Sequence, residues 1–383
     1  MNTAVAPIVI IGSGLAGYTL ARELRKLDRA TPLAVVTADE GSFYSKPMLS
    51  NALASGKSAS DLALKTAVAM AAELNATVHA GTEAQAIDLS ERRLRTSDGE
   101  LGWSKLVLAL GADPIRLPLS GDGAAAVLSV NDLRDYARFR TVLEGRKRVA
   151  ILGAGLIGCE FANDLVLAGH AVEVADIAAQ ALGRLIPPEA AAGLRAALAA
   201  AGVRWHLGKK AVAVDRSGNA LVLGFEDGTH IEADIVLSAV GLAPRTALAR
   251  TAGVEVRRGI VVDRFLRSSD PDVYALGDCA EVEGQVLPFV MPIMHAARAL
   301  ASTLSGSDKA LIYPPMPVVV KTPALPTVVC PPAPGAAGAW QIESETGGML
   351  ARYVDAADRL LGFALTGAAT AHKNRLVKEL QAA

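Results

Sequence analysis

The sequence has few of the residues that characterise secreted or nucleic-acid-binding proteins. Only 4% of its 383 residues are aromatic, and its three cysteines form no CxxC pair. This cysteine usage excludes a disulfide framework and predicts a reducing, cytoplasmic location. The formal net charge is only −1, because 38 Lys and Arg nearly cancel 39 Asp and Glu. Such a balance provides no general attraction to nucleic acid or to an anionic membrane.

Aliphatic residues are abundant instead. Hydrophobic residues make up 51% of the chain, and few of them are aromatic. A core of Ala, Val, Leu and Ile is typical of parallel strands covered by helices on both faces, which predicts the α/β class. The length predicts two or three domains. Residues 4–21 carry no charge, but they lack a basic flank and contain three glycines, which favours a buried strand and helix over a membrane segment.

Two glycine-rich stretches share one pattern. Residues 8–21 (IVIIGSGLAGYTLA) and 149–162 (VAILGAGLIGCEFA) each join a short apolar strand to a helix through three glycines. In such a turn the first glycine permits the bend, the second lets the backbone approach a pyrophosphate, and the third lets the helix pack on the strand. Hairpin turns follow at Asp98-Gly99 and Asp227-Gly228. The duplication predicts two dinucleotide-binding units; the alternative is two tight turns without ligands.

An acidic residue in the second unit indicates which dinucleotide binds there. The strand AVEVAD ends at Asp176, about twenty residues beyond Gly158, where a carboxylate bonds a ribose 2′-hydroxyl. Because a carboxylate repels a 2′-phosphate, we predict NADH rather than NADPH; the alternative is that Asp176 only caps the next segment. In the first unit the equivalent position falls near Thr37, Asp39 and Glu40, and the pattern does not decide among them.

The order of the motifs resembles a known family. The stretches SVNDLRD, AVGLAPRTALA and DVYALGDCAEV are similar to those of two-dinucleotide flavoprotein reductases related to glutathione reductase. The resemblance implies an α/β fold with two Rossmann-like, three-layer domains of the glutathione-reductase type, one for FAD and one for NAD(H). It implies an FAD-binding domain of residues 1–113 and 243–309, an NAD(H)-binding domain of residues 114–242, and a small α+β C-terminal domain of residues 310–383.

The resemblance also implies the cofactor-binding residues. In the family the Gly277-Asp278 pair bonds the ribityl chain of the flavin; a helix N-cap is the alternative for Asp278. Arg116 is expected near the adenine-side phosphate or in solvent. The residues expected to bind FAD are Gly12, Ser13, Gly14, Ala16, Gly17, Thr37, Asp39, Glu40, Lys46, Pro47, Ala109, Gly111, Arg116, Gly277, Asp278, Met291, Pro292 and Lys321. Those expected to bind NAD(H) are Gly153, Gly155, Leu156, Ile157, Gly158, Glu160, Asp176 and Gly241.

The segment in which related disulfide reductases carry a redox-active cysteine has none here. It reads GSFYSKPMLSNALASGKS, and the first cysteine of the chain is Cys159. Because thiol-based chemistry needs a thiolate at the flavin, electrons are expected to leave the flavin directly. The stretches YSKPMLSN, KTPALP and GQVLPFVMPIM are similar to those of rubredoxin reductases and flavorubredoxin reductases. This resemblance implies that one NADH reduces two rubredoxins, because FAD converts a hydride into two single-electron steps.

Two charged residues are candidates for catalysis. Lys46 lies in the proline-fixed SKPM loop, where a cation near flavin N5 or O4 would stabilise the reduced flavin; solvent exposure is the alternative. Glu160 follows the second glycine loop, and similar proteins use the matching Glu to hold the nicotinamide carboxamide; a first-turn acid that stabilises the helix dipole is the alternative. A helix beginning at or near Pro292 is expected to point its N-terminus at the flavin. Lys321 is expected to reach flavin or partner, or to be a solvated strand-edge lysine.

The sequence does not decide which electron acceptor the protein uses, and the alternatives imply different functions. Rubredoxins are small and acidic, so docking is expected to use a local Lys and Arg rim and to weaken with salt. The candidates for this rim are Lys46, Lys321, Lys373 and Arg375. Alternatives are an NADH:ferredoxin reductase of an oxygenase system, a redox-sensing flavoprotein of the apoptosis-inducing-factor type, and a direct NADH oxidase. No metal site is expected, nor a nucleic-acid or membrane partner, and a monomer is favoured by analogy with the family.

Overall fold

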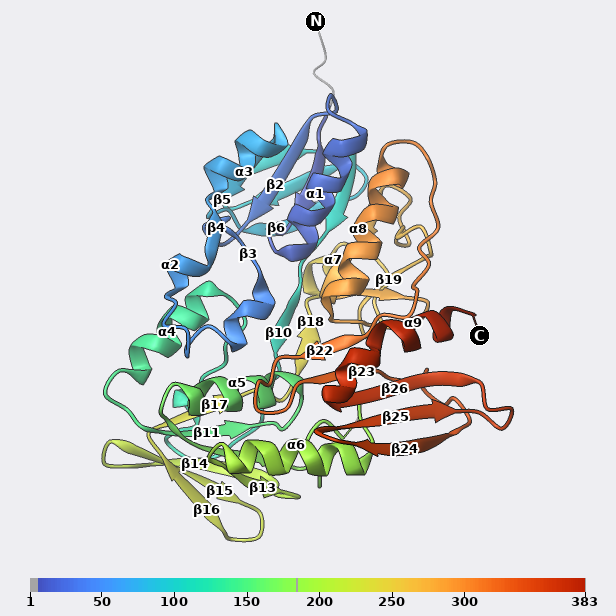
Figure 1. Cartoon of the computed structure of the whole chain (residues 1–383). Coiled ribbons are helices and arrows are strands. Elements are labelled where there is room, and N and C mark those ends of the chain that lie inside the picture. The colour runs from blue at the N-terminus through green and yellow to red at the C-terminus, as the bar shows by residue number, and fades with distance from the viewer. Residues whose placement is uncertain (1–5, 184, 383) are drawn as a thin grey trace, which may run out of the picture. The chain divides into compact units, whose positions relative to one another are not determined.

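The structure is a computed structural model, and it describes residues 6–183 and 185–382 (Figure 1). The chain forms two compact units. The first consists of Met1–Lys46, Asp61–Asp113 and Leu242–Tyr313, and the second of Pro47–Ser60, Pro114–Gly241 and Pro314–Ala383. Each unit is therefore assembled from segments that lie far apart in the sequence.

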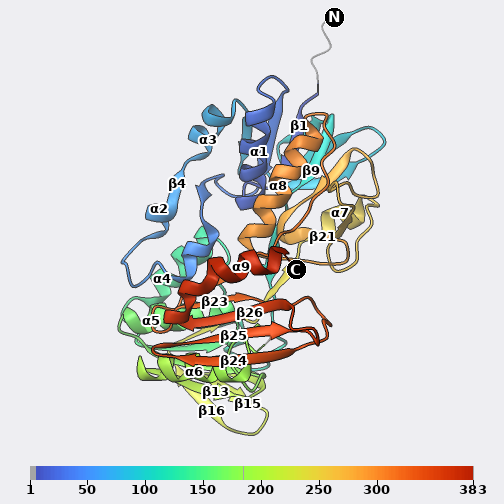
Figure 2. The ribbon, with the colours of Figure 1, turned by 45° about the vertical axis from the view of Figure 1, so that its right-hand side comes forward.

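A five-stranded parallel sheet forms the centre of the first unit. Its order is β20-β9-β1-β2-β5, with β1 (Ile8–Ile11), β2 (Leu33–Thr37), β5 (Thr77–Ala80), β9 (Lys105–Leu108) and β20 (Val273–Ala275). Strands β1 and β2 are buried at every position, as expected of apolar strands covered on both faces. Helix α1 (Leu15–Leu27) packs beside α8 (Val290–Leu304) and α3 (Ala67–Leu74) (Figures 1 and 2).

An antiparallel meander and several short elements complete this unit. The meander contains β6 (Ala84–Asp88), β7 (Arg93–Thr96) and β8 (Gly99–Gly102), which confirms the predicted hairpin turn at Asp98-Gly99. The other elements are β3 (Phe43–Tyr44), β4 (Ala63–Lys65), β18 (Leu242–Pro244), α7 (Ala247–Thr251), β19 (Ile260–Val262), η3 (Gly277–Cys279) and β21 (Ala280–Val282). Three further elements lie across the boundaries between the units: η1 (Lys46–Ser50), α2 (Ala59–Leu62) and β10 (Ala112–Pro114).

The second unit repeats this plan. Its parallel sheet has the order β13-β12-β11-β17, with β11 (Arg148–Leu152), β12 (Ala171–Asp176), β13 (Val203–Leu207) and β17 (Ile235–Ser238). An antiparallel meander of β14 (Ala211–Ser217), β15 (Ala220–Phe225) and β16 (His230–Ala233) accompanies it. The helices are α4 (Leu133–Leu143), α5 (Leu156–Leu167) and α6 (Pro188–Ala200), preceded by the short η2 (Ala124–Ala126). Both Rossmann-like units of the predicted α/β fold are therefore present.

The repeat extends to individual backbone hydrogen bonds. Gly12 N donates to Val36 O over 2.8 Å, and Gly153 N donates to Ala175 O over 2.8 Å. Each bond joins the end of the first strand to the end of the second strand of its sheet. The two glycine stretches thus occupy the same place in two copies of one fold, which confirms the duplication predicted from the sequence.

The C-terminal module is an antiparallel sheet with one helix. The strand order is β22-β23-β26-β25-β24, with β22 (Val318–Val320), β23 (Thr327–Cys330), β24 (Ala339–Glu345), β25 (Gly348–Val354) and β26 (Leu360–Gly367), followed by η4 (Ala368–His372) and α9 (Lys373–Ala382). This is the expected small α+β module. Within residues 6–183 and 185–382, none of the helices combines the length and the apolar character needed to cross a bilayer.

The C-terminal module shares a hydrophobic core with the second Rossmann-like fold. Val320 and Ala364 of the module belong to the same buried cluster as Val149 and Leu194. Helix α6 contacts β13 on the one hand and β26 on the other. This common core explains why the compact unit groups residues that the sequence divides between two domains. The three-domain division, with boundaries at 113, 242 and 309, remains our proposal for the functional parts of the chain.

Candidate functional site

The first glycine loop leaves an open space at the N-terminus of α1. Gly12 has φ +115°, and a Cβ there would lie 2.2 Å from Ala109 O. A Cβ on Gly17 would lie 1.9 Å from Gly12 O, whereas one on Gly14 would meet no atom within 4 Å. Gly14 is the N-cap of α1 and provides no side-chain cap. The first amides of the helix therefore face a space that can take an anionic group.

The second glycine loop has the same geometry. Gly153 has φ +106°, with a Cβ position 2.5 Å from Ala239 O, and a Cβ on Gly158 would lie 1.9 Å from Gly153 O. Gly155 caps α5, and a Cβ there would meet no atom within 4 Å. In both loops two glycines are required by close backbone packing and the middle one borders open space. This pattern fits one dinucleotide pyrophosphate in each unit.

Three of the polar residues predicted for the first unit converge at the end of β2. Ser13 Oγ lies 2.9 Å from Thr37 Oγ1 and 3.0 Å from Asp39 Oδ1. Asp39 Oδ1 also accepts hydrogen bonds from Thr37 Oγ1 at 2.7 Å and from Gly41 N at 2.9 Å. Glu40, the third ribose candidate, is exposed. Asp39 thus organises the loop through one oxygen.

Lys46 and Asp278 form an ion pair within the first unit. Lys46 Nζ lies 3.6 Å from Asp278 Oδ2, and the two side chains are 34% and 13% exposed. The alternative that Lys46 is merely a solvent-exposed lysine is therefore wrong, because its ammonium group is paired with Asp278. The N-cap alternative for Asp278 is wrong, because Leu276 holds the cap position of η3 and Asp278 lies inside the turn.

The segment around Gly277 lies beside the first glycine loop and α8. Gly277 has φ +82°, and a Cβ there would come within 2.8 Å of Ala16 Cβ. Gly277 and Pro292 line one small recess. Helix α8 begins at Val290, in agreement with the predicted start at or near Pro292, and Met291 in its first turn is 42% exposed. Gly111, with φ +72°, accepts a hydrogen bond from Arg245 N over 3.0 Å.

Asp176 ties the second glycine loop to the segment after β12. Its Oδ2 accepts a hydrogen bond from Ala154 N over 2.5 Å, and its Oδ1 accepts one from Ala178 N over 2.7 Å. The bond from Ala178 N agrees with the alternative that Asp176 caps the segment after β12. The bond from Ala154 N shows that Asp176 also contacts the glycine loop. Leu156 is half-buried and Ile157 is 41% exposed at the start of α5.

The remaining predicted residues of the second unit lie near β17 or at the surface. Gly241 has φ +120°, and a Cβ there would lie 3.5 Å from Ile115. Arg116 is exposed. It belongs to the second unit, whereas most of the residues predicted to bind FAD belong to the first.

A buried ionic cluster surrounds Glu160. The side chain is fully buried, and Oε2 lies 2.8 Å from Lys321 Nζ and accepts a hydrogen bond from Ser50 Oγ over 2.5 Å. Oε1 accepts a hydrogen bond from Lys321 N over 2.9 Å, and the Lys321 ammonium also bonds Pro47 O. The helix-dipole alternative for Glu160 is wrong, because the residue lies in the second turn of α5. Lys321 is not a solvated strand-edge lysine, because its side chain is only 26% exposed and is paired with Glu160.

Sequence reasoning missed three polar residues of this cluster and its surroundings. Ser50 is one of them. The others are Asp164, which accepts hydrogen bonds from Leu53 N and Ala54 N over 2.8 and 3.1 Å, and Asn163, whose Oδ1 accepts one from Ala324 N over 3.0 Å. Burial raises the pKa of Asp164 even though these amides favour the ionised form. Asn163 and Asp164 are polar residues in the otherwise apolar helix α5. Because buried polar groups require hydrogen-bonding partners, this pattern in the sequence indicates that the two residues contact other polar groups.

The cysteine thiols are buried and weakly acidic. Burial raises the pKa of Cys159 to about 12 and that of Cys279 to about 11. Burial also raises the pKa of Cys330. Thiolate chemistry at neutral pH is therefore disfavoured at all three. In the part of the chain that the structure describes, no cluster of His, Cys, Asp and Glu has the composition of a metal site.

Two family models match this chain, one over the Rossmann-like folds and one over the C-terminal module. Residues 6–302 match the family described as pyridine nucleotide-disulphide oxidoreductase, and residues 310–380 match a rubredoxin binding C-terminal domain. The chain is 49% identical over 377 residues to a rubredoxin-NAD(+) reductase from Alcanivorax borkumensis, covering 98% of this chain and 99% of the relative. It is 47% identical over 378 residues to a rubredoxin-NAD(+) reductase from Acinetobacter baylyi, covering 97% and 96%.

A solved structure with the same fold is a ferredoxin reductase from Rhodopseudomonas palustris. The TM-score is 0.88 and the sequence identity is 25%, and the match covers 96% of this chain and 92% of that one. The proteins similar to this chain thus include reductases named for rubredoxin and a reductase named for ferredoxin, the two acceptors considered from the sequence.

Proposed function

Because the chain belongs to the pyridine nucleotide-disulphide oxidoreductase family, we propose that it is an FAD-dependent NADH:rubredoxin oxidoreductase. The observation that carries this proposal is the match of residues 310–380 to a rubredoxin binding C-terminal domain.

FAD fits the first unit, and when bound it supplies the exchange of one hydride for two single electrons. In this proposal the amides at the start of α1 bind the pyrophosphate beside Gly14, where the structure leaves open space. Asp278 would accept hydrogen bonds from the ribityl hydroxyls, and Lys46, held by its ion pair with Asp278, would supply positive charge to the flavin. That charge favours the reduced cofactor electrostatically.

NADH fits the second unit. The start of α5 binds its pyrophosphate beside Gly155, and Asp176 bonds the ribose and disfavours a 2′-phosphate. Ser50 and Lys321 fix the position of the buried Glu160 carboxylate. To hold the nicotinamide carboxamide, Glu160 would exchange one of these bonds for a bond to the coenzyme. Orientation of this kind accounts for a large part of the barrier reduction in transfers between bound partners.

Direct electron transfer to an iron protein agrees with the state of the thiols. Burial raises the pKa of Cys159 to about 12 and that of Cys279 to about 11, so neither environment favours a thiolate. A thiol relay between flavin and acceptor therefore has no support among the described cysteines. When bound, FAD would supply electrons to the acceptor without a cysteine intermediate.

Helix α9 offers a basic surface for an acidic partner. Arg375 and Lys378 are exposed on it and Lys373 is partly exposed, and α9 lies within the segment that matches the rubredoxin binding domain. Complementary charge of this kind raises association rates and weakens with salt. We propose that the protein works as a monomer in the cytoplasm.

Anaerobic stopped-flow spectroscopy tests the proposal. The FAD-loaded protein is reduced with one equivalent of NADH and mixed with oxidised rubredoxin or with a plant-type [2Fe-2S] ferredoxin, at low and at high salt. We expect fast, salt-sensitive reduction of rubredoxin. Fast transfer to ferredoxin alone would favour the second candidate, a ferredoxin reductase, which the similarity to the Rhodopseudomonas palustris enzyme supports. Failure with both acceptors would overturn the proposal.

A variant pair separates docking from hydride transfer. Exchange of Arg375 and Lys378 for Gln should lower the second-order rate constant for rubredoxin at low salt and leave flavin reduction by NADH unchanged. The matched control is the exchange of Arg29 and Arg95 for Gln, since both are exposed in the first unit. Equal rates in the two double variants would exclude α9 from the docking surface.

A further inference from the structure

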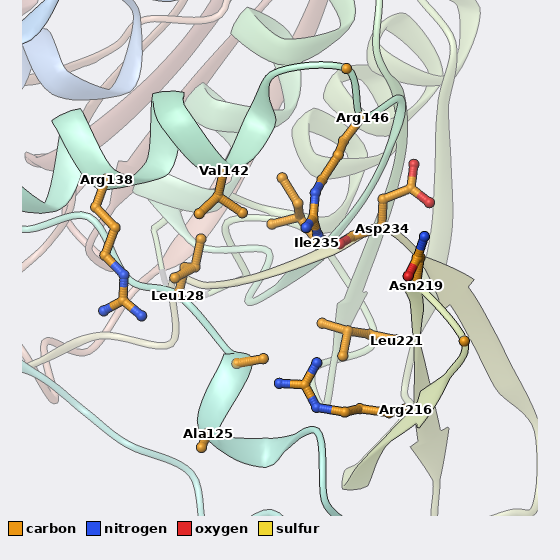
Figure 3. Close-up of a pocket in the computed structure, with 13 residues that line it drawn as sticks. Ala125, Leu128, Arg138, Val142, Arg146, Arg216, Asn219, Leu221, Asp234 and Ile235 are labelled. Atoms are coloured by element: carbon orange, nitrogen blue, oxygen red, sulfur yellow. Dashed lines mark hydrogen bonds between the residues drawn. The ribbon is translucent and has the colours of Figure 1, made fainter.

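A recess of about 670 Å³ lies in the second unit, and it has no part in the functions described above. It is bordered by α4 and the turn after it, by η2, by the β14–β15 hairpin and by the start of β17 (Figure 3). This volume is typical of sites for small organic molecules.

The recess has an apolar floor and a basic rim. Leu128, Val142, Leu221 and Ile235 supply apolar surface. Three arginines line the same recess: Arg138 on α4, Arg146 in the turn after it, and Arg216 on β14. In Figure 3 the guanidinium groups of Arg138 and Arg216 lie on either side of the apolar residues. A ligand with an apolar body and a negative group matches this lining.

The lining carries three arginines and one aspartate, so its positive charge is in excess. Two further carboxylates lie nearby: Asp135 interacts electrostatically with Arg138, and Asp122 accepts a hydrogen bond from Arg216 N. The carboxylate of Asp234, also in the lining, already pairs with Arg148 at 2.7 Å and accepts hydrogen bonds from Lys147 N and Arg148 N. The Arg146 guanidinium donates a hydrogen bond to the backbone oxygen of Asp234 over 2.7 Å. Among the described residues, no carboxylate lies within ion-pair distance of Arg138 or Arg216. Guanidinium groups bind carboxylate and phosphate in two-pronged geometry, so an anionic ligand would complement the excess positive charge of the lining.

The recess is distinct from the dinucleotide site of the same unit. Arg146 and Asp234 lie at the amino ends of the parallel strands β11 and β17, whereas the glycine loop begins at Gly153, beyond the carboxyl end of β11. A strand of this length spans about 17 Å at about 3.3 Å per residue. Dinucleotides bind at the carboxyl ends of such strands, so the recess needs another ligand.

We propose that this recess binds a small amphiphilic anion, in which a carboxylate or phosphate meets the guanidinium group of Arg138 or of Arg216 and an apolar body lies against Leu128 and Val142. Nothing in the proposed reductase reaction requires this ligand. The site is therefore independent of the transfer of electrons to rubredoxin.

Isothermal titration calorimetry tests the site on the FAD-loaded protein with NAD⁺ at saturation, so that both dinucleotide sites are occupied. The probes are 4-phenylbutyrate, phenyl phosphate, the neutral 4-phenyl-1-butanol and inorganic phosphate. We expect saturable binding of one or both organic anions, at least tenfold tighter than that of the alcohol and of inorganic phosphate. The anion that binds more tightly identifies the headgroup.

Variants assign the binding to the recess. Exchange of Arg138 and Arg216 for Gln should weaken the organic anion at least tenfold, whereas exchange of the exposed Arg195 and Arg250 for Gln should leave it unchanged. Undiminished binding in the first variant, equal binding of the neutral alcohol, or no saturable binding of either anion would overturn the proposal. So would dimerisation of the protein through this face. NADH:rubredoxin turnover, measured in parallel, should be unchanged in both variants, so that a failure of the reductase function is recognised separately.

Discussion

The ammonium group of Lys321 lies 2.8 Å from Oε2 of Glu160, a carboxylate with no exposed surface. Lys321 follows β22 of the C-terminal module, and Glu160 belongs to the helix that begins at the second glycine loop. The module predicted to serve the partner thus also fixes a residue of the predicted dinucleotide site. Because a buried charge is costly unless it is paired and hydrogen-bonded, this contact couples the two parts energetically.

Removal of the Lys321 charge should destabilise the protein. In Lys321→Met, Glu160 keeps the hydrogen bond from Ser50 and loses its cation, so we expect the free energy of unfolding to fall by about 2–4 kcal/mol. Denaturation of the FAD-loaded protein in urea measures the change. The control is Lys378→Met, which removes an exposed lysine of the same module and should change the free energy by less than about 0.5 kcal/mol.

A double-mutant cycle identifies the pair as the cause. Glu160→Gln combined with Lys321→Met should recover part of the stability that the single Lys321 variant loses, because the unpaired carboxylate is then absent. If the effects of the two exchanges simply add, the ion pair contributes nothing beyond the separate side chains.

Two glycines of one loop should respond differently to the same substitution. Gly12→Ala places a Cβ 2.2 Å from Ala109 O at φ +115°, so it should lower the stability of the FAD-free protein by at least about 2 kcal/mol. Gly14→Ala meets no protein atom within 4 Å, so the FAD-free protein should keep its stability. FAD affinity should nevertheless fall about tenfold, or about 1.4 kcal/mol, if the open space holds the pyrophosphate.

Thermal unfolding without FAD and fluorescence titration with FAD measure these two effects. Gly155→Ala is the matched control, since it changes the equivalent position of the second unit and should weaken NADH but not FAD. Unchanged FAD affinity in Gly14→Ala would contradict the assignment of the first loop.

The duplicated fold was predictable from the sequence because its determinants are local. Gly12 and Gly153 each lie at the end of an apolar strand, and their positive φ and close backbone contacts require glycine whatever the rest of the chain does. The turns at Asp98 and Asp227 follow from the same short-range chemistry. Local patterns therefore specified both Rossmann-like folds.

The cluster around Glu160 was not predictable in the same way. Its members Ser50 and Lys321 lie 110 and 161 residues from Glu160 in the sequence, and each is unremarkable in its own segment. They come together because η1, which contains Ser50, and the C-terminal module, which contains Lys321, both contact the helix that carries Glu160. The basic recess was missed for the same reason, because Arg138, Arg146 and Arg216 belong to three different elements.

Asp176 should determine the choice between NADH and NADPH. Asp176→Asn removes the negative charge and disturbs the bonds from Ala154 N and Ala178 N, because an amide can accept at only one of its two polar atoms. The ratio of kcat/KM for NADH to that for NADPH should fall at least about tenfold. Steady-state reduction of an artificial dye acceptor measures the ratio without the iron protein.

The control for this exchange is Glu173→Gln, in the same strand β12. Glu173 pairs with His206 at 2.7 Å, so its loss should alter stability without changing the preference between the coenzymes. A preference unchanged in Asp176→Asn would mean that this carboxylate does not face the ribose.

The buried thiols should make the protein less stable at alkaline pH. The pKa values of Cys159 and Cys279 are about 12 and 11 in the folded protein, against an ordinary value of 9.0. As the pH rises above 9, the unfolded chain loses these protons first, so the free energy of unfolding falls until the folded pKa is reached. Each thiol contributes a slope of about 1.4 kcal/mol per pH unit in that range, and below pH 9 the contribution is constant.

Equilibrium unfolding between pH 8 and 10.5 measures this slope. Other groups titrate in the same range, so the informative quantity is the difference between the protein and its Cys159→Ala/Cys279→Ala variant, which should have the shallower dependence. At pH 8 an aromatic disulfide reagent should label the native thiols at least about 100-fold more slowly than the new thiol of Ser90→Cys, an exposed position. Rapid labelling of the native protein would mean that a thiolate is accessible, and the argument for direct transfer from flavin to iron would then fail.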